Sequence, residues 1–186
     1  ATGGGPGAME AAHLGARLSS GDPADDDARL DQALALLAPA PRYTDQRWLA
    51  AAFAVLAEVL GPTPDGHRAR SVGVPTWFYG HEPPTPFAPV IAKYFENSLR
   101  EDGLVTIADR GIVFAEGSAG TIQEIFQDAA QNHYCTIGGV ASPMVLLGSD
   151  HWRDRYPVAP LLERMVAGRV NEALVRLLDR PEDAVA

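Results

Sequence analysis

The sequence contains little cysteine, little lysine and no long apolar run, and each of these absences excludes a class of protein. Its only cysteine, Cys135, can form neither an intrachain disulfide nor a cysteine-based zinc cage. Its only lysine, Lys93, is not followed by the Ser or Thr of a Walker A loop, and no other residue could carry pyridoxal phosphate. The apolar stretch 48–60 is interrupted by polar residues and is too short to span a membrane. These absences predict a protein of the reducing cytoplasm that needs no metal and no cofactor.

Negative charge predominates, because the formal net charge is −9 and the isoelectric point is about 4.9. An acidic surface repels phosphodiester backbones and anionic lipids, so we expect neither a nucleic acid nor a membrane as partner. A small phosphate ligand would have to be held by local dipoles and a few well-placed cations, nearly all of them arginines.

Short apolar runs alternate with stretches of helical periodicity, and this alternation predicts an α/β fold. We expect one Rossmann-like domain over residues 1–186, with a parallel sheet covered by helices on both faces and a helical insertion at about 22–62. The predicted strands are 71–79, 111–115 and 143–148, and the predicted helices are 8–18, 25–37, 44–60, 89–101, 121–132 and 157–178.

Two segments share the order strand, turn of small residues, helix. The first runs from Thr2 to Glu10 and the second from Gly111 to Glu124. Glycines let a backbone turn sharply, and the amides that this frees at a helix N-terminus attract an anion such as phosphate. One such loop is as well explained by an ordinary strand-to-helix turn, but two in a short chain favour a phosphate ligand.

These segments resemble two motifs of the Lonely Guy (LOG) family of nucleoside 5′-monophosphate phosphoribohydrolases. Thr2–Glu10 is similar to Gly-Gly-Gly-x-x-Gly-x-Met, and the second segment is similar to Pro-Gly-Gly-x-Gly-Thr-x-x-Glu. The order matches, and Pro143–Leu147 resembles the family strand that follows. The resemblance implies hydrolysis of a nucleoside 5′-monophosphate to free base and ribose 5-phosphate by a homodimer or larger homo-oligomer. It also implies that the sheet lacks the family's N-terminal strand-helix-strand, as in a fragment of a longer protein.

The resemblance further implies which residues bind the small-molecule nucleotide. Glu124 would be the catalytic carboxylate, although Thr121-x-x-Glu124 also reads as a capping box that only starts a helix. The residues of the second loop would bind the phosphate: Gly117, Ser118, Gly120 and Thr121. The residues of the first loop would contact the ribose and base: Gly4, Gly5, Gly7 and Met9.

An arginine that precedes the second loop is the other catalytic residue that the resemblance implies. Lys93, Asn97 and Arg100 would share one face of the helix predicted at 89–101. Arg100 would clamp the phosphate or support the departing base, with Asn97 beside it. A solvated polar face explains the same spacing equally well.

Two departures from the second motif motivate a different function. Glu116 stands where the family has proline, and Ser118 replaces a glycine. A carboxylate beside a phosphate loop is unfavourable unless it points away or meets a partner. The alternative is therefore a protein that binds or senses nucleotides without hydrolysing them. The five histidines show no metal-binding spacing, and we expect them at the surface or at helix ends.

Overall fold

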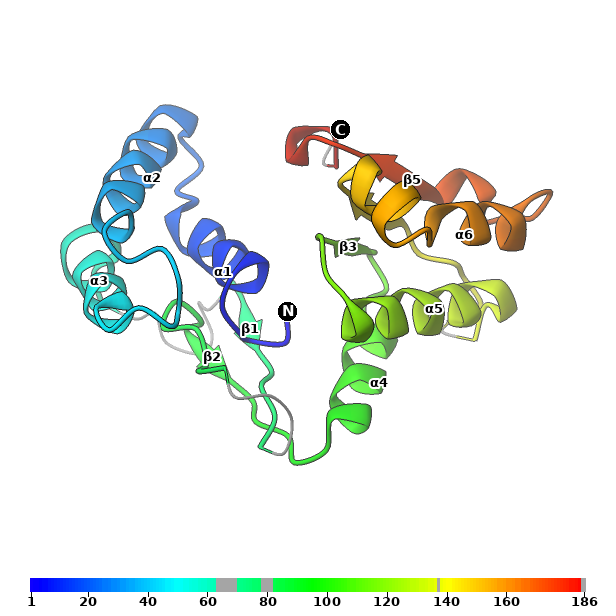
Figure 1. Ribbon diagram of the computed structural model, residues 1–186, viewed down its shortest axis with the longest axis horizontal. Helices are drawn as coiled ribbons and strands as arrows, with labels where there is room; N and C mark the ends of the chain where they lie inside the picture. Colours follow the sequence, from blue (N-terminus) through cyan, green and yellow to red (C-terminus); the bar gives the residue numbers. More distant parts are fainter. Residues whose placement is uncertain (63–69, 78–81, 137, 185–186) are drawn as a thin grey trace. The chain divides into compact units, whose positions relative to one another are not determined.

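The computed structural model describes residues 1–62, 70–77, 82–136 and 138–184. Their contacts divide the chain into two compact units, Ala1–Arg100 and Glu101–Ala186. Each unit combines short parallel strands with helices, which confirms the α/β class (Figure 1).

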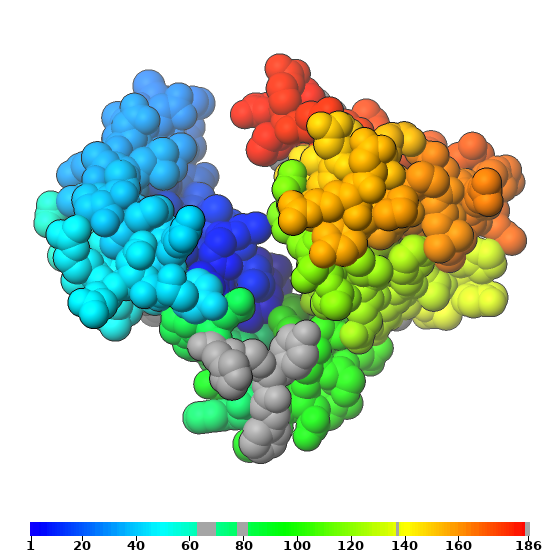
Figure 2. Space-filling model, in the orientation of Figure 1, coloured from blue at the N-terminus to red at the C-terminus, as the bar shows by residue number. Residues whose placement is uncertain are grey.

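Helices dominate the N-terminal unit. They are α1 (Ala8–Leu18), α2 (Pro23–Leu37) and α3 (Trp48–Val55), which continues as the π-helical turn η1 (Leu56–Leu60). The prediction of these helices is confirmed, and α2 and α3 form much of the blue and cyan surface in Figure 2. Their apolar faces pack together, because burying leucine, valine and aromatic side chains supplies most of a small unit's stability. The buried cluster consists of Leu14, Leu18, Ala33, Ala52, Val55 and Phe87.

The strands of this unit are very short. β1 (Val72–Gly73) pairs in parallel with β2 (Val90–Ile91) on one side and bridges in parallel to Thr2 on the other. Thr2 donates its N–H to the Val72 carbonyl at 3.1 Å, so the chain does enter the first glycine loop from an extended segment. Part of the predicted strand, residues 78–79, lies outside the described residues.

The helix predicted at 89–101 is wrong in its first half. Val90 and Ile91 form β2, and α4 (Asn97–Ile107) begins only after them. The backbone between them is held by the sheet, since the Ala92 N–H donates to the Gly73 carbonyl at 3.0 Å. Lys93 therefore does not share a helical face with Asn97, and its Nζ instead lies 3.8 Å from the centre of the Trp77 ring.

The C-terminal unit contains a parallel sheet in the order β3-β4-β5, with strands β3 (Ile112–Phe114), β4 (Met144–Leu147) and β5 (Val175–Leu178). Leu146 in the central strand pairs with Phe114 on one side and Leu177 on the other. Helix α5 (Ala119–Tyr134) connects β3 to β4, while the π-helical turn η2 (His151–Arg155) and α6 (Ala159–Val166) connect β4 to β5. Because the strands are parallel, their carboxyl ends share one edge.

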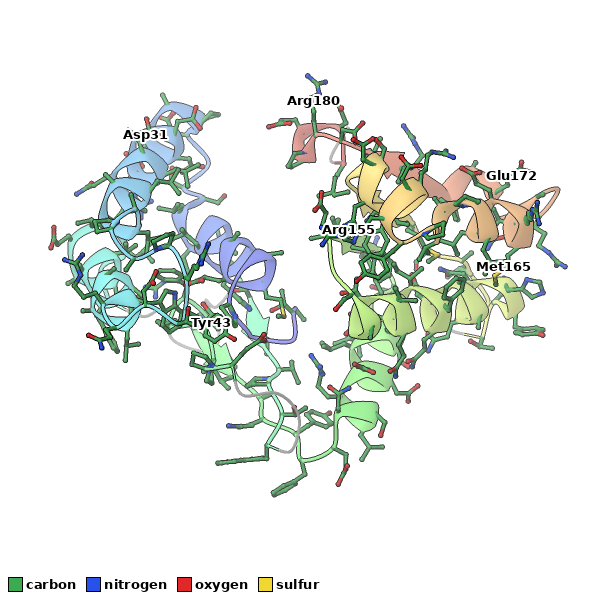
Figure 3. The ribbon with its side chains drawn as sticks, in the orientation of Figure 1. Asp31, Tyr43, Arg155, Met165, Glu172 and Arg180 are labelled. Carbon is green, nitrogen blue, oxygen red and sulfur yellow. The ribbon has the colours of Figure 1, made fainter. Side chains whose placement is uncertain are left out.

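The predicted helix at 157–178 is correct only for α6. Its second half contains the short 3-10 turn η3 (Glu172–Leu174) and the strand β5. Val175–Leu178 alternates between partly buried and exposed side chains at its start and pairs along its whole length with β4. Met165 of α6, labelled in Figure 3, packs against the core of this unit. That core consists of Phe114, Ile125, Ala129, Met144, Leu146, Trp152, Val158, Ala159 and Leu162.

Candidate functional site

The first glycine loop connects Thr2 to α1 through two residues in the left-handed region. Gly4 has a φ of 73° and Gly7 has a φ of 77°. A Cβ atom on Gly4 would lie 3.0 Å from both the Val74 nitrogen and the Pro75 Cδ, so the loop rests directly on the chain that follows β1. Gly4 therefore needs glycine both for its conformation and for this close approach.

Two amides of this loop, those of Gly4 and Gly7, have acceptors within the protein. The Gly4 N–H donates to Thr2 Oγ1 at 2.9 Å, and the Gly4 carbonyl accepts the Thr85 N–H at 2.8 Å. Gly7 is the N-cap of α1, and its N–H donates to the Glu10 carboxylate, which Trp48 also contacts by a hydrogen bond. Burial raises the pKa of Glu10 despite these bonds. The positive end of α1 thus already has a carboxylate of its own beside it.

A buried histidine fixes the entry to the loop. His13 is fully buried and hydrogen-bonds through Nε2 to Thr2 Oγ1 at 2.8 Å and through Nδ1 to Ser71 Oγ at 2.9 Å. Burial lowers the pKa of His13 and so favours the neutral ring. The expectation of a surface histidine is wrong here, because the helical spacing of α1 turns His13 inward with Leu14.

Several predicted site residues meet beside this loop. Arg100 Nη2 donates to Asn97 Oδ1 at 2.5 Å, and the Arg100 guanidinium lies against Gly3, where an added Cβ would overlap Nη1. A Cβ on Gly5 would lie 2.8 Å from Met9 Cε and 3.5 Å from Glu82 Oε2. The N-terminal unit therefore groups the glycine turn with Met9, Asn97 and Arg100, and it adds the carboxylate of Glu82.

The second glycine loop connects β3 to α5 and differs in having no acidic residue in the first turn of its helix. Helix α5 begins at Ala119 with Ser118 as N-cap, and the Ser118 side chain makes no capping hydrogen bond. The first helical amide with a partner is that of Ile122, which donates to the Ser118 carbonyl at 2.9 Å. Within the described ranges, the amides of residues 118–121 have no hydrogen-bond acceptor, and Ser118 and Ala119 are exposed. This helix N-terminus is open to an anion.

Two contacts define the shape of this loop. A Cβ on Gly117 would overlap Thr121 Oγ1, so only glycine lets the Thr121 side chain fold back over the loop. The capping-box interpretation of Thr121 and Glu124 is wrong, because the N-cap is Ser118 and Thr121 already lies inside the first turn of α5. Glu124 is partly buried one helical turn after Thr121, so both side chains lie on one face of α5.

Glu116, which departs from the family motif, meets a partner. Its Oε2 lies 3.6 Å from Nδ1 of His151, whose Nε2 lies 2.8 Å from the Gly117 carbonyl oxygen and 3.3 Å from the Gly117 nitrogen. The Glu116 side chain lies over Gly148, which has a φ of 95° and where an added Cβ would be 2.7 Å from Oε1. His151 is only 8% exposed, so its contact with Gly117 joins the loop to the buried part of the unit.

His151 was missed by sequence reasoning, although a signal was present. It follows β4 and Glu116 follows β3, so both come after the carboxyl ends of neighbouring parallel strands, which share an edge. Ser149 and Asp179 show the same relation for β4 and β5, because the Ser149 hydroxyl donates to Asp179 Oδ1 at 2.6 Å. Hydrogen bonds from the side chain and backbone of Ser149 lower the pKa of Asp179.

Comparisons with known proteins add no family assignment. No protein-family model and no curated protein matches the sequence. Among the described residues, no cluster of three or more His, Cys, Asp or Glu side chains is placed to hold a metal ion. The same part of the chain contains no helix with the length and apolar character that a bilayer span requires. Any function must therefore be argued from the two loops.

Proposed function

We propose that the protein hydrolyses the N-glycosidic bond of a nucleoside 5′-monophosphate and releases the free base and ribose 5-phosphate. The observation that carries this proposal is the second loop, where amides at the exposed start of α5 have no recorded acceptor among the described residues and Glu124 lies one turn further on. This combination offers a phosphate-binding helix end and a carboxylate on the same rigid helix.

The phosphate is bound by the main chain at residues 118–121. Amides at the first turn of a helix point along its axis, and the helix dipole adds a partial positive charge at the same place. The Ser118 and Thr121 hydroxyls supply further donors, and Gly117 and Gly120 let the ligand approach without a Cβ in the way. Binding of this kind suits an acidic chain, because it needs no cluster of lysines.

Glu124 is the catalytic carboxylate. As the bond between the base nitrogen and ribose C1′ breaks, its electrons leave with the base and positive charge builds on the ribose ring. A fixed carboxylate stabilises that charge and accepts a proton from the water whose oxygen bonds to C1′. The base leaves with a proton, and the products are the free base and ribose 5-phosphate. Thr121 lies inside the first turn of α5 and is not its N-cap, which supports this role over that of a capping box.

The first loop, taken by itself, suits neutral polar groups better than a phosphate. Its Gly4 and Gly7 amides already have acceptors, and the carboxylates of Glu10 and Glu82 lie beside it. Carboxylates repel a phosphate but accept hydrogen bonds from sugar hydroxyls and base amino groups. Arg100, whose Nη2 donates to Asn97 Oδ1, supplies a cation beside this loop. A Rossmann-like domain, a homodimer or larger homo-oligomer and a cytoplasmic location belong to the same proposal.

A second function is favoured by one observation, the carboxylate of Glu116 beside the second loop. Negative charge there weakens phosphate binding and would suit a protein that releases its ligand readily. In this alternative the chain binds or senses nucleotides and leaves the glycosidic bond intact.

Product analysis distinguishes the two functions. The protein is incubated with a panel of purine and pyrimidine 5′-monophosphates, and the free base and ribose 5-phosphate are quantified by chromatography. We expect equal amounts of the two products, and at least a roughly 100-fold loss of turnover in Glu124→Gln. Glu58→Gln, which neutralises an exposed carboxylate on η1, is the matched control and should retain activity.

Two results would change the proposal in different ways. Saturable nucleotide binding with no base released by the wild type would replace the enzymatic proposal with the sensing one. Turnover that Glu124→Gln leaves unchanged would remove the mechanism while keeping the activity.

A further inference from the structure

A buried imidazole contacts the second glycine loop from the end of a neighbouring strand. His151 is the first residue of η2, which follows β4, and it is 8% exposed. Its ring packs against two aromatic rings, with centroid distances of 4.5 Å to Trp152 and 5.2 Å to Tyr156. Nδ1 lies 3.6 Å from Glu116 Oε2, and Nε2 lies 2.8 Å from the Gly117 carbonyl oxygen and 3.3 Å from the Gly117 nitrogen. Each ring nitrogen therefore has polar atoms beside it that depend on where the ring protons lie.

The Glu116 carboxylate favours a proton on Nδ1. An ionised carboxylate only accepts hydrogen bonds, so a bare Nδ1 would place two acceptors against each other. The neutral ring then has a bare Nε2, which accepts the Gly117 N–H but also faces the Gly117 carbonyl oxygen, a second acceptor, at 2.8 Å. The charged ring carries a proton on Nε2 and donates it to that carbonyl oxygen. Protonation of His151 thus exchanges the partner of Nε2 from the N–H of Gly117 to its carbonyl.

This exchange changes what the second loop offers to an anion. When the ring is charged, the Gly117 N–H is released next to the amides of residues 118–121, and the ring offsets the negative charge of Glu116. When the ring is neutral, Nε2 takes the Gly117 N–H and the charge of Glu116 is no longer offset by the ring. Both differences favour anion binding by the charged form.

The other charged groups around the ring do not reverse this effect. Tyr156, the C-cap of η2, also faces the ring, and phenol groups stay neutral in the pH range where imidazole groups change charge. Arg153, in the same turn as His151, is paired with Glu163 of α6 at 2.6 Å. Glu116 is therefore the charged group from another element that lies against a nitrogen of the ring.

We propose that His151 is a positioning residue for the second loop and that its proton sets the anion affinity of that loop. The loop binds an anion more tightly when the ring is charged than when it is neutral. The affinity is therefore highest at the acid end of the range in which imidazole groups titrate, and it falls as the pH rises through that range. Because a bound anion favours the charged ring, binding also takes up a proton. This inference rests on the proposed function, which places the anion at this loop.

The ring and its partner can be observed by NMR of the full chain without any anionic ligand. We expect the ring-nitrogen signals of His151 to show protons on both nitrogens at about pH 5 and on Nδ1 alone at about pH 8. The Gly117 amide signal should follow the same titration curve. A neutral ring with its proton on Nε2, or a Gly117 signal that does not respond to pH, would overturn the proposal.

Sulfate binding, measured by calorimetry, tests the consequence for the loop. Sulfate, unlike phosphate, keeps its charge across this range, so a change in its affinity comes from the protein. We expect the wild-type affinity to be at least about fivefold lower at about pH 8 than at about pH 5. His151→Gln keeps a donor for the Gly117 carbonyl but has no titratable group, so its affinity should be nearly independent of pH. His133→Gln, in the last turn of α5, is the matched control and should keep the wild-type profile.

These measurements distinguish a failure of the inference from a failure of the proposed function. If neither sulfate nor phosphate binds at either pH, the anion site is absent, and the proposed function falls together with the role of His151. If sulfate binds equally at both pH values, or if His151→Gln keeps the wild-type profile, the role of His151 is wrong while the anion site remains. The wild-type NMR titration and sulfate profile decide the question if His151→Gln does not fold.

Discussion

The two glycine loops have the same local plan but use their backbone amides in different ways. Each follows an extended segment that pairs in parallel and leads into a helix. In the first loop, Thr2 Oγ1 accepts a hydrogen bond from the Gly4 amide, and the Glu10 carboxylate accepts one from the Gly7 amide. In the second, the N-cap Ser118 and the first helical residue Ala119 are exposed, and Gly120 and Thr121 are partly buried. Glycine content therefore identifies the turn, while the neighbouring side chains decide whether it can take an anion.

The side chains around each loop explain this difference. Glu10 occupies the third helical position of α1, from which a carboxylate can reach back to the N-cap amide. The corresponding position of α5 holds Thr121, which folds over Gly117 instead. The N-terminus of α1 thus has a carboxylate of its own helix beside it, which opposes an anionic ligand, whereas the N-terminus of α5 has none.

Paired glycine substitutions should separate the two roles most strongly. In Gly4→Ala, a Cβ must adopt a left-handed conformation and approach the Val74 nitrogen at 3.0 Å. We expect a loss of about 2 kcal/mol or more in the free energy of unfolding, measured by urea denaturation. Gly117→Ala has no positive φ to maintain, but its Cβ displaces Thr121. It should weaken phosphate binding about tenfold, with less than about 1 kcal/mol of destabilisation.

The opposite result would contradict this distinction between the two loops. If Gly4→Ala lost phosphate affinity at full stability while Gly117→Ala bound phosphate normally, the assignment of roles to the two loops would be wrong.

A smaller effect is expected from the carboxylates beside the loops. Glu116→Gln removes a negative charge next to the second loop while keeping the shape of the side chain over Gly148. Phosphate affinity, measured by calorimetry at low salt, should rise about two- to fivefold and the gain should shrink at high salt, because Glu116 is largely exposed and screened. Glu82→Gln removes a carboxylate beside the first loop and should leave phosphate affinity unchanged. An equal response of the two variants would remove the distinction between the loops.

Much of the fold follows from local sequence patterns. The long helices α1, α2 and α5 and the strands β3 and β4 were predicted, because amphipathic periodicity and glycine boundaries are local signals. The strands β2 and β5 were predicted as helix, since each is very short and exists through pairing with a strand distant in the sequence. Such pairing overrides local preference and leaves no periodic pattern.

In the candidate site, too, local features could be predicted and contacts between distant segments could not. The glycine turns and the position of Glu124 could be predicted, because each lies within one continuous segment. The contact between Glu116 and His151 joins residues that follow different strands, so it becomes visible only when the parallel order of β3 and β4 is known. The contact of Glu10 with the Gly7 amide could also be predicted, because a glutamate three residues after the N-cap can reach back to the N-cap amide.

The most direct test of the account is an amide NMR titration of the whole chain with inorganic phosphate, using chloride at equal ionic strength as the reference. The account predicts that the amide signals of residues 118–121 shift together along one saturable binding curve while those of Gly4 and Gly7 stay in place. Shifts at Gly4 and Gly7 with none at 118–121 would contradict it, because phosphate would then bind at the loop whose amides are already taken.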